Sequence, residues 1–448
     1  TMSLIVSDRR TLVVGLGITG LSCVRYLLGQ GRSVAVADSR KNPPGLEAVR
    51  TEFPDVAVHC GEFDADLFAG FNELVVSPGI SVKTPAIAAA REKGAAIRGD
   101  IDLFSDAAKA PIVAITGSNG KTTVTTLVGE MAKAAGVKVA VGGNIGTPAL
   151  DLLADDVALY VLELSSFQLE TTARLNAKAA TILNVTDDHM DRYASKMAYF
   201  QAKQNIFNGC EIAVVNLDDA LSQPMARDNM AFIGYGVHRI NPETYSLRED
   251  EGDKWITHGF ENLIRANELG LMGTHNLMNI MAALALGEAV GLPMDTMLTV
   301  ARQFKGLPHR CQFVRRLRDV DYVNDSKGTN VGATVAAIDS LKPTGGQLVL
   351  IAGGDGKGAD FAPLRPAVKD TCRQVLVLGK DADQLKAALG DAAPVTVVTD
   401  LDEAVTLAAQ IAESGDRVLL SPACSSLDMF RNYEARGEHF MALVGGLS

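Results

Sequence analysis

A run of glycine, lysine and threonine residues at positions 116–123 has the composition of a loop that binds phosphate groups. The run reads Thr116, Gly117, Ser118, Asn119, Gly120, Lys121, Thr122 and Thr123. It follows an apolar β-branched segment and precedes an amphipathic one. Glycines expose backbone N–H groups, a helix N-terminus favours anions, and a lysine reaches the outer phosphates of a nucleotide. The run therefore predicts binding of a nucleoside triphosphate, although Ile115 occupies the position of the usual first glycine.

Three neighbouring predicted strands also run into polar side chains, namely Glu163, Asn144 and a segment that contains His189. Because the carboxyl ends of parallel strands meet at one edge of a sheet, these groups should converge beside the phosphate loop. Mg²⁺ prefers oxygen ligands, and Glu163 with the Thr122 hydroxyl could supply them. A carboxylate at a strand end is often only solvated, but beside a phosphate loop the metal role is favoured. For His189 a purely structural role is equally open.

A second glycine-rich turn, GLGITG at positions 15–20, follows a predicted strand near the N-terminus. Asp38 ends the next predicted strand, and Ser77 lies at the end of a later one. Read alone, this pattern predicts a dinucleotide-binding turn with a carboxylate for the ribose. Any nucleoside diphosphate ligand would suit the same turn.

Two Asp-x-Lys motifs follow predicted strands in the C-terminal third, at Asp325 and Lys327 and at Asp355 and Lys357. The segment SPACSS, residues 421–426, follows a further strand. A lysine after a strand is more often solvent-exposed than functional. Two such motifs on one sheet edge nevertheless favour a site for an anion.

The elements that must position these residues are short β-branched runs that alternate with longer amphipathic stretches, a pattern typical of α/β proteins with mostly parallel sheets. Strands are expected at 11–15, 33–38, 73–77, 111–116, 137–141, 158–164, 179–185, 322–324, 348–352, 375–378, 395–398 and 417–420. Helices are expected at 122–135, with Gly136 as the stop signal, and at 277–290.

The 448 residues and the grouping of the motifs predict three domains. These are a Rossmann-like N-terminal domain at 1–99, a central parallel-sheet domain with the phosphate loop at 100–307, and a Rossmann-like C-terminal domain at 308–448.

Composition limits the classes of partner and the compartment. A hydrophobic content of 47% excludes a disordered chain, and a net charge of −11 argues against nucleic acid or an anionic membrane as the main partner. The six cysteines are scattered, without a CxxC pair or zinc spacing. No signal-peptide pattern and no apolar run long enough for a membrane helix is visible. We therefore expect a cytoplasmic protein.

Eight segments of the chain resemble the Mur ligases, in the same order: ITGSNGKTT, LELSSFQLE, NVTDDHMDRY, GTHNLMN, GLPHR, NDSKGTN, GGDGKGADF and SPACSSLDMF. The similarity extends from Gly15 to Gly437. Within the family, GLGITG, GGDGKGADF and SPACSSLDMF are similar to the members that add D-glutamate to UDP-N-acetylmuramoyl-L-alanine. The resemblance implies a monomeric, ATP-dependent amide ligase of peptidoglycan precursor synthesis. ATP would phosphorylate the substrate carboxyl group, and the amine of D-glutamate would attack the acyl phosphate.

The resemblance also implies a role for particular residues, with catalytic roles for Lys121, His189, Lys203 and Lys327. ATP would be bound by residues 117–123 together with Asn276, Asn279, Arg310 and Asp325. The UDP-muramoyl substrate would be bound by Ile18, Thr19, Asp38, Ser39, Arg40, Ser77 and Asn144. D-glutamate would be bound by Lys327, Thr329, Lys357, Ser426, Leu427 and Tyr433. Two Mg²⁺ sites would be formed from Thr122, Glu163, His189 and Lys203.

The pattern and the resemblance disagree about Lys203. The helical stretch around Lys203 reads as ordinary, and the residue pattern alone predicts a solvent-exposed lysine. The resemblance implies that Lys203 is carbamylated, as N6-carboxylysine, and faces Mg²⁺. Two positions depart from the family pattern: Tyr433 replaces the more usual Phe, and Gly328 replaces a common Ala, a change that we expect to be harmless.

Three other functions fit parts of the sequence. An NAD-dependent oxidoreductase would explain only residues 15–38 and would leave the phosphate loop without a role. A phosphate-loop NTPase without ligase chemistry would have no use for the SPACSSLDMF segment. A folylpolyglutamate synthetase-like ligase shares the central motifs but lacks a separate N-terminal nucleotide-binding domain.

Overall fold

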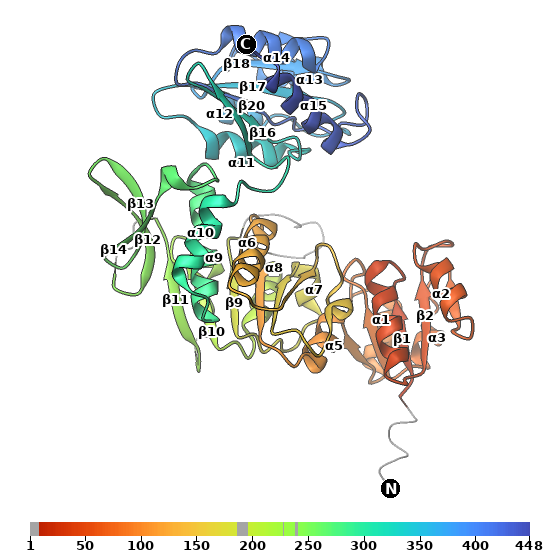
Figure 1. The fold of residues 1–448 in the computed structure, drawn as a ribbon. Coiled ribbons are helices and arrows are strands. Elements are labelled where there is room, and N and C mark those ends of the chain that lie inside the picture. Colours follow the sequence, from red (N-terminus) through yellow and green to blue (C-terminus); the bar gives the residue numbers. More distant parts are fainter. Residues whose placement is uncertain (1–8, 186–195, 227, 238–240) are drawn as a thin grey trace. The chain divides into compact units, whose positions relative to one another are not determined.

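The computed structural model describes residues 9–185, 196–226, 228–237 and 241–448, and contacts divide the chain into two compact units. The first unit contains the chain up to Arg265 together with Met278–Ala301. The second unit contains Ala266–Leu277 and Arg302–Ser448. The first unit contains two mainly parallel sheets and the second unit one, each flanked by helices, which confirms the expected α/β class (Figure 1).

The N-terminal part of the first unit is a five-stranded parallel sheet in the order β3-β2-β1-β4-β5. Its strands are β1 (Thr11–Val14), β2 (Val34–Asp38), β3 (Val58–Cys60), β4 (Glu73–Val76) and β5 (Ala96–Arg98). Its helices are α1 (Ile18–Gly29), α2 (Leu46–Glu52), α3 (Ala65–Ala69) and α4 (Pro85–Glu92). Since β1 lies between β2 and β4, the ends of these three strands are neighbours.

The rest of the first unit is a nine-stranded sheet in the order β14-β13-β12-β11-β10-β9-β6-β8-β7. Its strands are β6 (Ile112–Thr116), β7 (Val139–Gly143), β8 (Leu159–Glu163), β9 (Ala179–Ile182), β10 (Ile212–Asn216), β11 (Ala231–Tyr235), β12 (Thr244–Asp250), β13 (Asp253–His258) and β14 (Glu261–Arg265). The sheet is parallel except for the antiparallel pairs β12–β13 and β13–β14, an extension that the sequence did not predict.

The helices of this region flank the sheet (Figure 1). They are α5 (Asp100–Ala107), α6 (Lys121–Ala134), α7 (Ser166–Glu170), α8 (Lys196–Gln204), α9 (Thr274–Ala289) and α10 (Met294–Gln303), with short 3₁₀ turns at Ala149–Leu152, Asn205–Phe207 and Ala220–Ser222. The chain of α9 passes from the second unit into the first at residue 278.

Helix α6 forms where the sequence predicted it because its apolar residues recur on one side. Val124, Leu127, Val128 and Met131 are all fully buried against the sheet. The helix ends before Gly136, whose φ of +79° suits the left-handed residue that follows many helices.

One continuous hydrophobic core joins the two sheets of the first unit. It includes Val13 and Val24 of the N-terminal region, Phe104 of α5, and Leu162 and Ile182 of the central strands. The Phe104 ring packs edge-on against Tyr160 with a centroid distance of 5.0 Å. This shared core explains why the N-terminal and central regions form one compact unit.

The second unit contains a six-stranded sheet in the order β15-β16-β20-β17-β18-β19, parallel apart from β15. Its strands are β15 (Gln312–Leu317), β16 (Val320–Asn324), β17 (Leu348–Gly353), β18 (Cys372–Leu378), β19 (Val395–Val397) and β20 (Arg417–Leu420). Its helices are α11 (Val331–Leu341), α12 (Leu364–Val368), α13 (Ala382–Leu389), α14 (Leu401–Ile411) and α15 (Tyr433–Gly445), with a 3₁₀ turn at Ala266–Glu268. Within the described ranges, no helix has both the length and the apolar character needed to cross a membrane.

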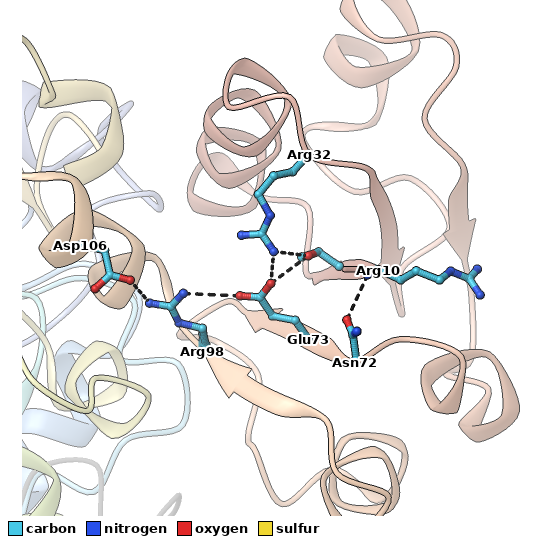
Figure 2. A network of polar contacts seen from close by, with 7 residues as sticks. Arg10, Arg32, Asn72, Glu73, Arg98 and Asp106 are labelled. Carbon is cyan, nitrogen blue, oxygen red and sulfur yellow. Dashed lines mark hydrogen bonds and ion pairs between the residues drawn. The ribbon is translucent and has the colours of Figure 1, made fainter. Parts of the chain in front are cut away.

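A buried carboxylate ties the N-terminal sheet to helix α5. Glu73 accepts hydrogen bonds from Thr11 (2.9 Å) and from Arg32, and its other oxygen lies 3.5 Å from Arg98 (Figure 2). Arg98 also pairs with Asp106 of α5. Burial by itself raises the pKa of Glu73, but the hydrogen bonds and the two guanidinium charges outweigh burial, and the pKa is lowered. Ionised Glu73 therefore stabilises this junction.

We expect Glu73→Gln to destabilise the N-terminal sheet at neutral pH by about 1.5–3 kcal/mol, the range for a lost hydrogen bond to a charged group. Because the pKa in the folded state lies below the usual value of 4.5, the contribution is complete above that value and disappears as the pH falls through the folded-state pKa. Hydrogen exchange over β1 and β4, measured near neutrality and in acid, should show a difference between variant and wild type that closes in acid.

The matched control is Glu52→Gln, which removes an exposed ion pair with Arg25. It should leave exchange in β1 and β4 unchanged. Equal effects of the two substitutions, or a difference that persists in acid, would contradict the role given to Glu73.

Candidate active site

The phosphate loop connects the buried strand β6 to the first turn of α6, as the sequence predicted. Gly120 precedes the helix with a φ of +88°, and a Cβ atom there would lie 2.5 Å from Asn279 Oδ1. Only glycine allows this conformation and this close approach. The Lys121 ammonium donates to the Gly117 carbonyl across the loop at 2.7 Å. The arrangement places a cation and the open N-terminus of a 14-residue helix at one point.

Asn184, just beyond β9, holds the other side of the phosphate loop. Its Oδ1 accepts from the Asn119 N–H at 2.8 Å, and its Nδ2 donates to the Asn119 carbonyl at 2.9 Å. Its own carbonyl accepts from Ser118 N–H at 3.0 Å. No role for Asn184 was predicted from the sequence. The signal available there was an amide side chain at the end of the strand that pairs with β6.

Glu163 lies at the end of β8, on the other flank of β6, and is 2% exposed. The Thr122 hydroxyl lies 3.1 and 3.2 Å from its two carboxylate oxygens. A capping box follows directly, in which Ser165 accepts from Gln168 N–H and Gln168 accepts from Ser165 N–H, and this box fixes the turn after the strand. A buried carboxylate beside a hydroxyl and a phosphate loop is an oxygen donor set that fits Mg²⁺.

Lys203 is buried, with 2% of its surface exposed, so the expectation of a solvent-exposed lysine is wrong. Its Nζ lies 4.9 Å from the ring centroid of Tyr199, one turn earlier on α8. The Tyr199 hydroxyl in turn lies 3.1 Å from the Ser118 hydroxyl of the phosphate loop. Tyr199 thus connects Lys203 to the phosphate loop, a link that the sequence analysis missed because its aromatic side chain resembled ordinary core.

Two candidate residues of the central region remain, Asn144 and His189, and the structure describes only Asn144. The Asn144 N–H donates to the Glu163 carbonyl at 2.7 Å, so the end of β7 joins the same edge. His189 lies outside the described residues. Among the residues that are described, no three His, Cys, Asp or Glu side chains form a group able to hold a metal ion.

The N-terminal candidates gather at the carboxyl edge of the first sheet. Asp38 is 2% exposed and accepts hydrogen bonds from the Leu16 N–H at 2.8 Å and from the Arg40 guanidinium at 3.0 and 2.8 Å. Burial raises the pKa of Asp38, but the bonds from Arg40 and Leu16 exceed that effect and the pKa is lowered. The Ser77 hydroxyl lies 3.4 Å from the Gly15 carbonyl.

Ile18 and Thr19 begin α1, whose N-terminus has no side-chain cap, and Ile18 is 71% exposed. Ser39 is exposed between Asp38 and Arg40. An uncapped helix N-terminus next to an ordered carboxylate–guanidinium pair is suited to a nucleoside diphosphate. The edge therefore offers donors for phosphate despite the negative charge of the whole chain.

The ATP candidates of the second unit include Asp325, at the end of β16. Asp325 accepts from the Ser421 hydroxyl at 2.7 Å and from the Cys311 N–H at 3.1 Å. Burial raises its pKa to about 6 despite these bonds and the charge of Arg310. Asn276 donates from Nδ2 to the Met272 carbonyl at 2.8 Å. Asn279, by contrast, belongs to the first unit, where it lies beside the phosphate loop.

A buried arginine joins the two loops that carry Lys327 and Ser426. Arg436 of α15 donates to the Ser326 hydroxyl at 2.9 Å, to the Ser326 carbonyl at 2.7 Å and to the Cys424 carbonyl at 3.1 Å. Burial lowers its pKa to about 10. Tyr433, on the same helix, packs edge-on against His309 at a centroid distance of 6.1 Å.

The other amino-acid candidates differ in exposure. Thr329, Lys357 and Leu427 are exposed, whereas Ser426 is buried. A Cβ atom at Gly328 would lie 2.6 Å from Asp325 Oδ2, so the glycine found here lets that carboxylate approach the backbone. The second unit thus presents hydroxyl and ammonium groups along the carboxyl edge of its sheet.

Family models match three successive parts of the chain. Residues 9–99 match the Mur ligase MurD-like N-terminal domain, residues 115–287 the Mur ligase middle domain, and residues 309–424 the Mur ligase glutamate ligase domain.

Full-length relatives agree with these matches. The chain is 68% identical over 446 residues to a protein of Marinobacter nauticus named UDP-N-acetylmuramoylalanine--D-glutamate ligase, with 100% of both chains covered. It is 56% identical over 448 residues to a protein of the same name from Pseudomonas aeruginosa, again with 100% of both covered.

Solved structures support the same fold. A pseudomurein peptide ligase type C from Methanothermus fervidus is 18% identical with a TM-score of 0.57 over 98% of this chain and 100% of that one. A UDP-N-acetylmuramate-alanine ligase from Thermotoga maritima is 19% identical with a TM-score of 0.54 over 97% and 99%. At such low identity these structures speak for the fold alone. The family models and the full-length relatives establish that the chain belongs to the Mur ligase family.

Proposed function

We propose that this chain is an ATP-dependent amide ligase that adds D-glutamate to UDP-N-acetylmuramoyl-L-alanine, in the synthesis of peptidoglycan precursors. The observation that carries the proposal is the phosphate loop after β6, which lies between Asn184, just beyond β9, and Glu163, at the end of β8. The identity of 68% to a full-length ligase of this name supports the same substrates. A dehydrogenase would leave the loop unused, and an NTPase without ligase chemistry would not need the SPACSSLDMF segment.

The phosphate loop supplies what the uphill step of amide formation needs. A carboxylate and an amine do not condense directly in water, so the carboxyl group is first phosphorylated by ATP. One substrate carboxylate oxygen bonds to the γ-phosphorus and ADP leaves; the amine then bonds to the acyl carbon and phosphate leaves. Lys121 and the loop N–H groups hold the transferring phosphoryl group and balance its charge.

Thr122, Glu163, His189 and Lys203 are the residues proposed to hold two Mg²⁺ ions, with Lys203 as a carbamate. Mg²⁺ supplies charge neutralisation for the phosphates. The burial of Lys203 supports the carbamate, because burial disfavours the charged form of an amine and carbamate formation needs the neutral one. A carbamate presents two oxygens, the ligands that this cation prefers.

The other proposed binding residues are grouped by the ligand that they would bind. The edge with Ile18, Thr19, Asp38, Ser39, Arg40 and Ser77 is proposed to bind the UDP group, and Asn144 the muramoyl group. Asn276, Asn279, Arg310 and Asp325 are proposed for ATP, and Lys327, Thr329, Lys357, Ser426, Leu427 and Tyr433 for D-glutamate. Three domains at 1–99, 100–307 and 308–448 are proposed to carry these roles in a cytoplasmic monomer.

Phosphate release with UDP-N-acetylmuramoyl-L-alanine tests the function directly. Release should require D-glutamate and should stay at background with L-glutamate or D-alanine. Equal release without any amino acid would identify an NTPase instead.

Lys121→Ala should lower kcat by about 100-fold or more, because it removes a charge that acts on the transferring phosphoryl group. The control is Lys133→Ala, an exposed lysine in the last turn of the same helix, which should retain wild-type kcat. Turnover of Lys121→Ala within a few-fold of wild type at saturating ATP would refute the loop assignment.

Lys203→Ala should nearly abolish turnover while the unfolding temperature and ATP affinity change little, because the lost group is a metal ligand. Acetate at high concentration should restore part of the activity by occupying the vacated oxygen positions, and Lys203→Glu should retain more activity than Lys203→Ala. The decisive observation is the electron density at Lys203 in a crystal grown with Mg²⁺, nucleotide and bicarbonate. A plain amine there would overturn the carbamate.

A further inference from the structure

A third loop supports the proposed amino-acid site and has no role in the function given above. It consists of Gly379, Lys380 and Asp381, between β18 and α13, in the blue C-terminal part of Figure 1. Strand β17 lies between β18 and β20, so this loop neighbours the one that carries Lys357. The loops after β17 and β20 are themselves joined by two backbone hydrogen bonds between Asp355 and Ser425, at 3.0 and 2.9 Å.

Asp381 fixes the backbone that leads into Lys357. Asp381 occupies the N-cap position of α13, but its side chain makes no capping hydrogen bond to that helix. Instead Asp381 Oδ2 accepts from the Gly356 N–H at 2.7 Å, and the Asp381 N–H donates to the Gly354 carbonyl at 3.0 Å. Asp381 therefore binds Gly354 and Gly356, the two neighbours of Asp355 in the loop. Gly356 directly precedes Lys357.

Lys380 connects the loops after β17 and β20. Its N–H donates to Asp428 Oδ2 at 3.0 Å, and its ammonium lies 3.8 Å from Asp355 Oδ2. The preceding Gly379 has a φ of +85°, and a Cβ atom there would lie 2.7 Å from Asp428 Oδ2 and 2.8 Å from Gly354 Cα. The three loops are thus packed without room for an added side chain at this point.

The charges around these loops would oppose a dicarboxylate unless they were balanced. Asp355, Asp381 and Asp428 all contribute oxygens to the contacts just described, close to the proposed ligand Lys357. All three carboxylates accept charge-assisted bonds from backbone N–H groups, with Asp355 Oδ1 accepting from the Lys357 N–H at 3.0 Å. Asp355 Oδ2 also has the ammonium of Lys380 beside it. Since D-glutamate carries two carboxylates, the charge of Lys380 reduces the repulsion that Asp355 would exert.

We propose that Lys380 and Asp381 are positioning residues of the amino-acid site. Asp381 holds the backbone that presents Lys357, and Lys380 offsets the charge of Asp355, so that a dicarboxylic amino acid can bind. This inference rests on the proposed function, because it takes Lys357 as a ligand of D-glutamate.

Substitutions at Asp381 separate its hydrogen bond from its charge. Asp381→Ala leaves Gly356 N–H without its acceptor and should raise the KM for D-glutamate about tenfold, with the KM for ATP unchanged. Asp381→Asn keeps an oxygen acceptor and removes a negative charge, so its KM should match the wild type or fall below it. Equal KM values for the Ala and Asn variants would overturn the role given to this carboxylate.

Substitutions at Lys380 test the charge. Lys380→Ala should raise the KM for D-glutamate about three- to tenfold, Lys380→Glu should raise it further, and Lys380→Arg should keep it near wild type. Added salt should shrink these differences. The unfolding temperature should not change, because the Lys380 side chain is 65% exposed and exposed ion pairs add little stability. Lys386→Ala, an exposed lysine farther along α13, is the matched control and should have no effect.

A double variant gives the sharpest outcome. If Lys380 acts by offsetting Asp355, adding Asp355→Asn to Lys380→Ala should return the KM for D-glutamate towards wild type. No recovery, or the same KM for Lys380→Ala and Lys386→Ala, would overturn the proposal.

The wild type and Lys357→Ala separate this inference from the function on which it rests. Absence of D-glutamate-dependent phosphate release by the wild type would mean that the proposed function fails. An active wild type whose KM rises with Lys357→Ala but not with changes at Lys380 or Asp381 would mean that only the present inference fails.

Discussion

The position of β6 between β8 and β9 is the constraint on which the rest of the site depends. Parallel neighbours end at the same edge, so the loop after β6 has Glu163 on one side and Asn184 on the other. A phosphate loop without these flanks would bind an anion but would lack the Glu163 carboxylate as a cation ligand and the Asn184 bonds that hold its backbone. All residues of these three strands are buried, so the packing of the core fixes where each strand ends.

Each of the three sheets places polar or charged groups at the carboxyl ends of its parallel strands. The first sheet places Asp38 and the start of α1 at its carboxyl edge, and the last sheet places Asp325 and Lys357 at its own. Such edges supply local donors for phosphate and carboxylate groups, which explains how a chain with a net charge of −11 can act on anionic substrates. In the last sheet the donors lie among several aspartates, and the balance of charge there becomes a determinant of binding in its own right.

Sequence patterns predicted the parts of the structure that depend on local periodicity. The strand, loop and helix around Lys121 appear where the pattern placed them, and the convergence of Glu163 and Asn144 at one edge follows from parallel strands. The burial of Lys203 could not be predicted from periodicity, because a long polar side chain on a helix is usually solvated. Its burial depends on tertiary packing, which includes the contact with the Tyr199 ring.

Contacts between loops could not be predicted from the sequence either, because their partners lie far apart in the chain. The bonds of Asn184 to Asn119 and of Asp381 to Gly356 join residues 65 and 25 positions apart. Nothing in either segment signals its partner, since an amide or a carboxylate after a strand fits a solvated turn equally well. The antiparallel strands β12–β14 were likewise not predicted, and their sheet position depends on pairing with β11.

The central claim is that the phosphate loop serves to activate a carboxyl group. It is tested most directly by labelling the carboxylate of UDP-N-acetylmuramoyl-L-alanine with oxygen-18 and weighing the phosphate released during turnover with ATP and D-glutamate. If the carboxylate attacks the γ-phosphorus and is later displaced by the amine, each phosphate should carry one labelled oxygen. Phosphate that contains no label would show that ATP is cleaved by water, and would contradict the account.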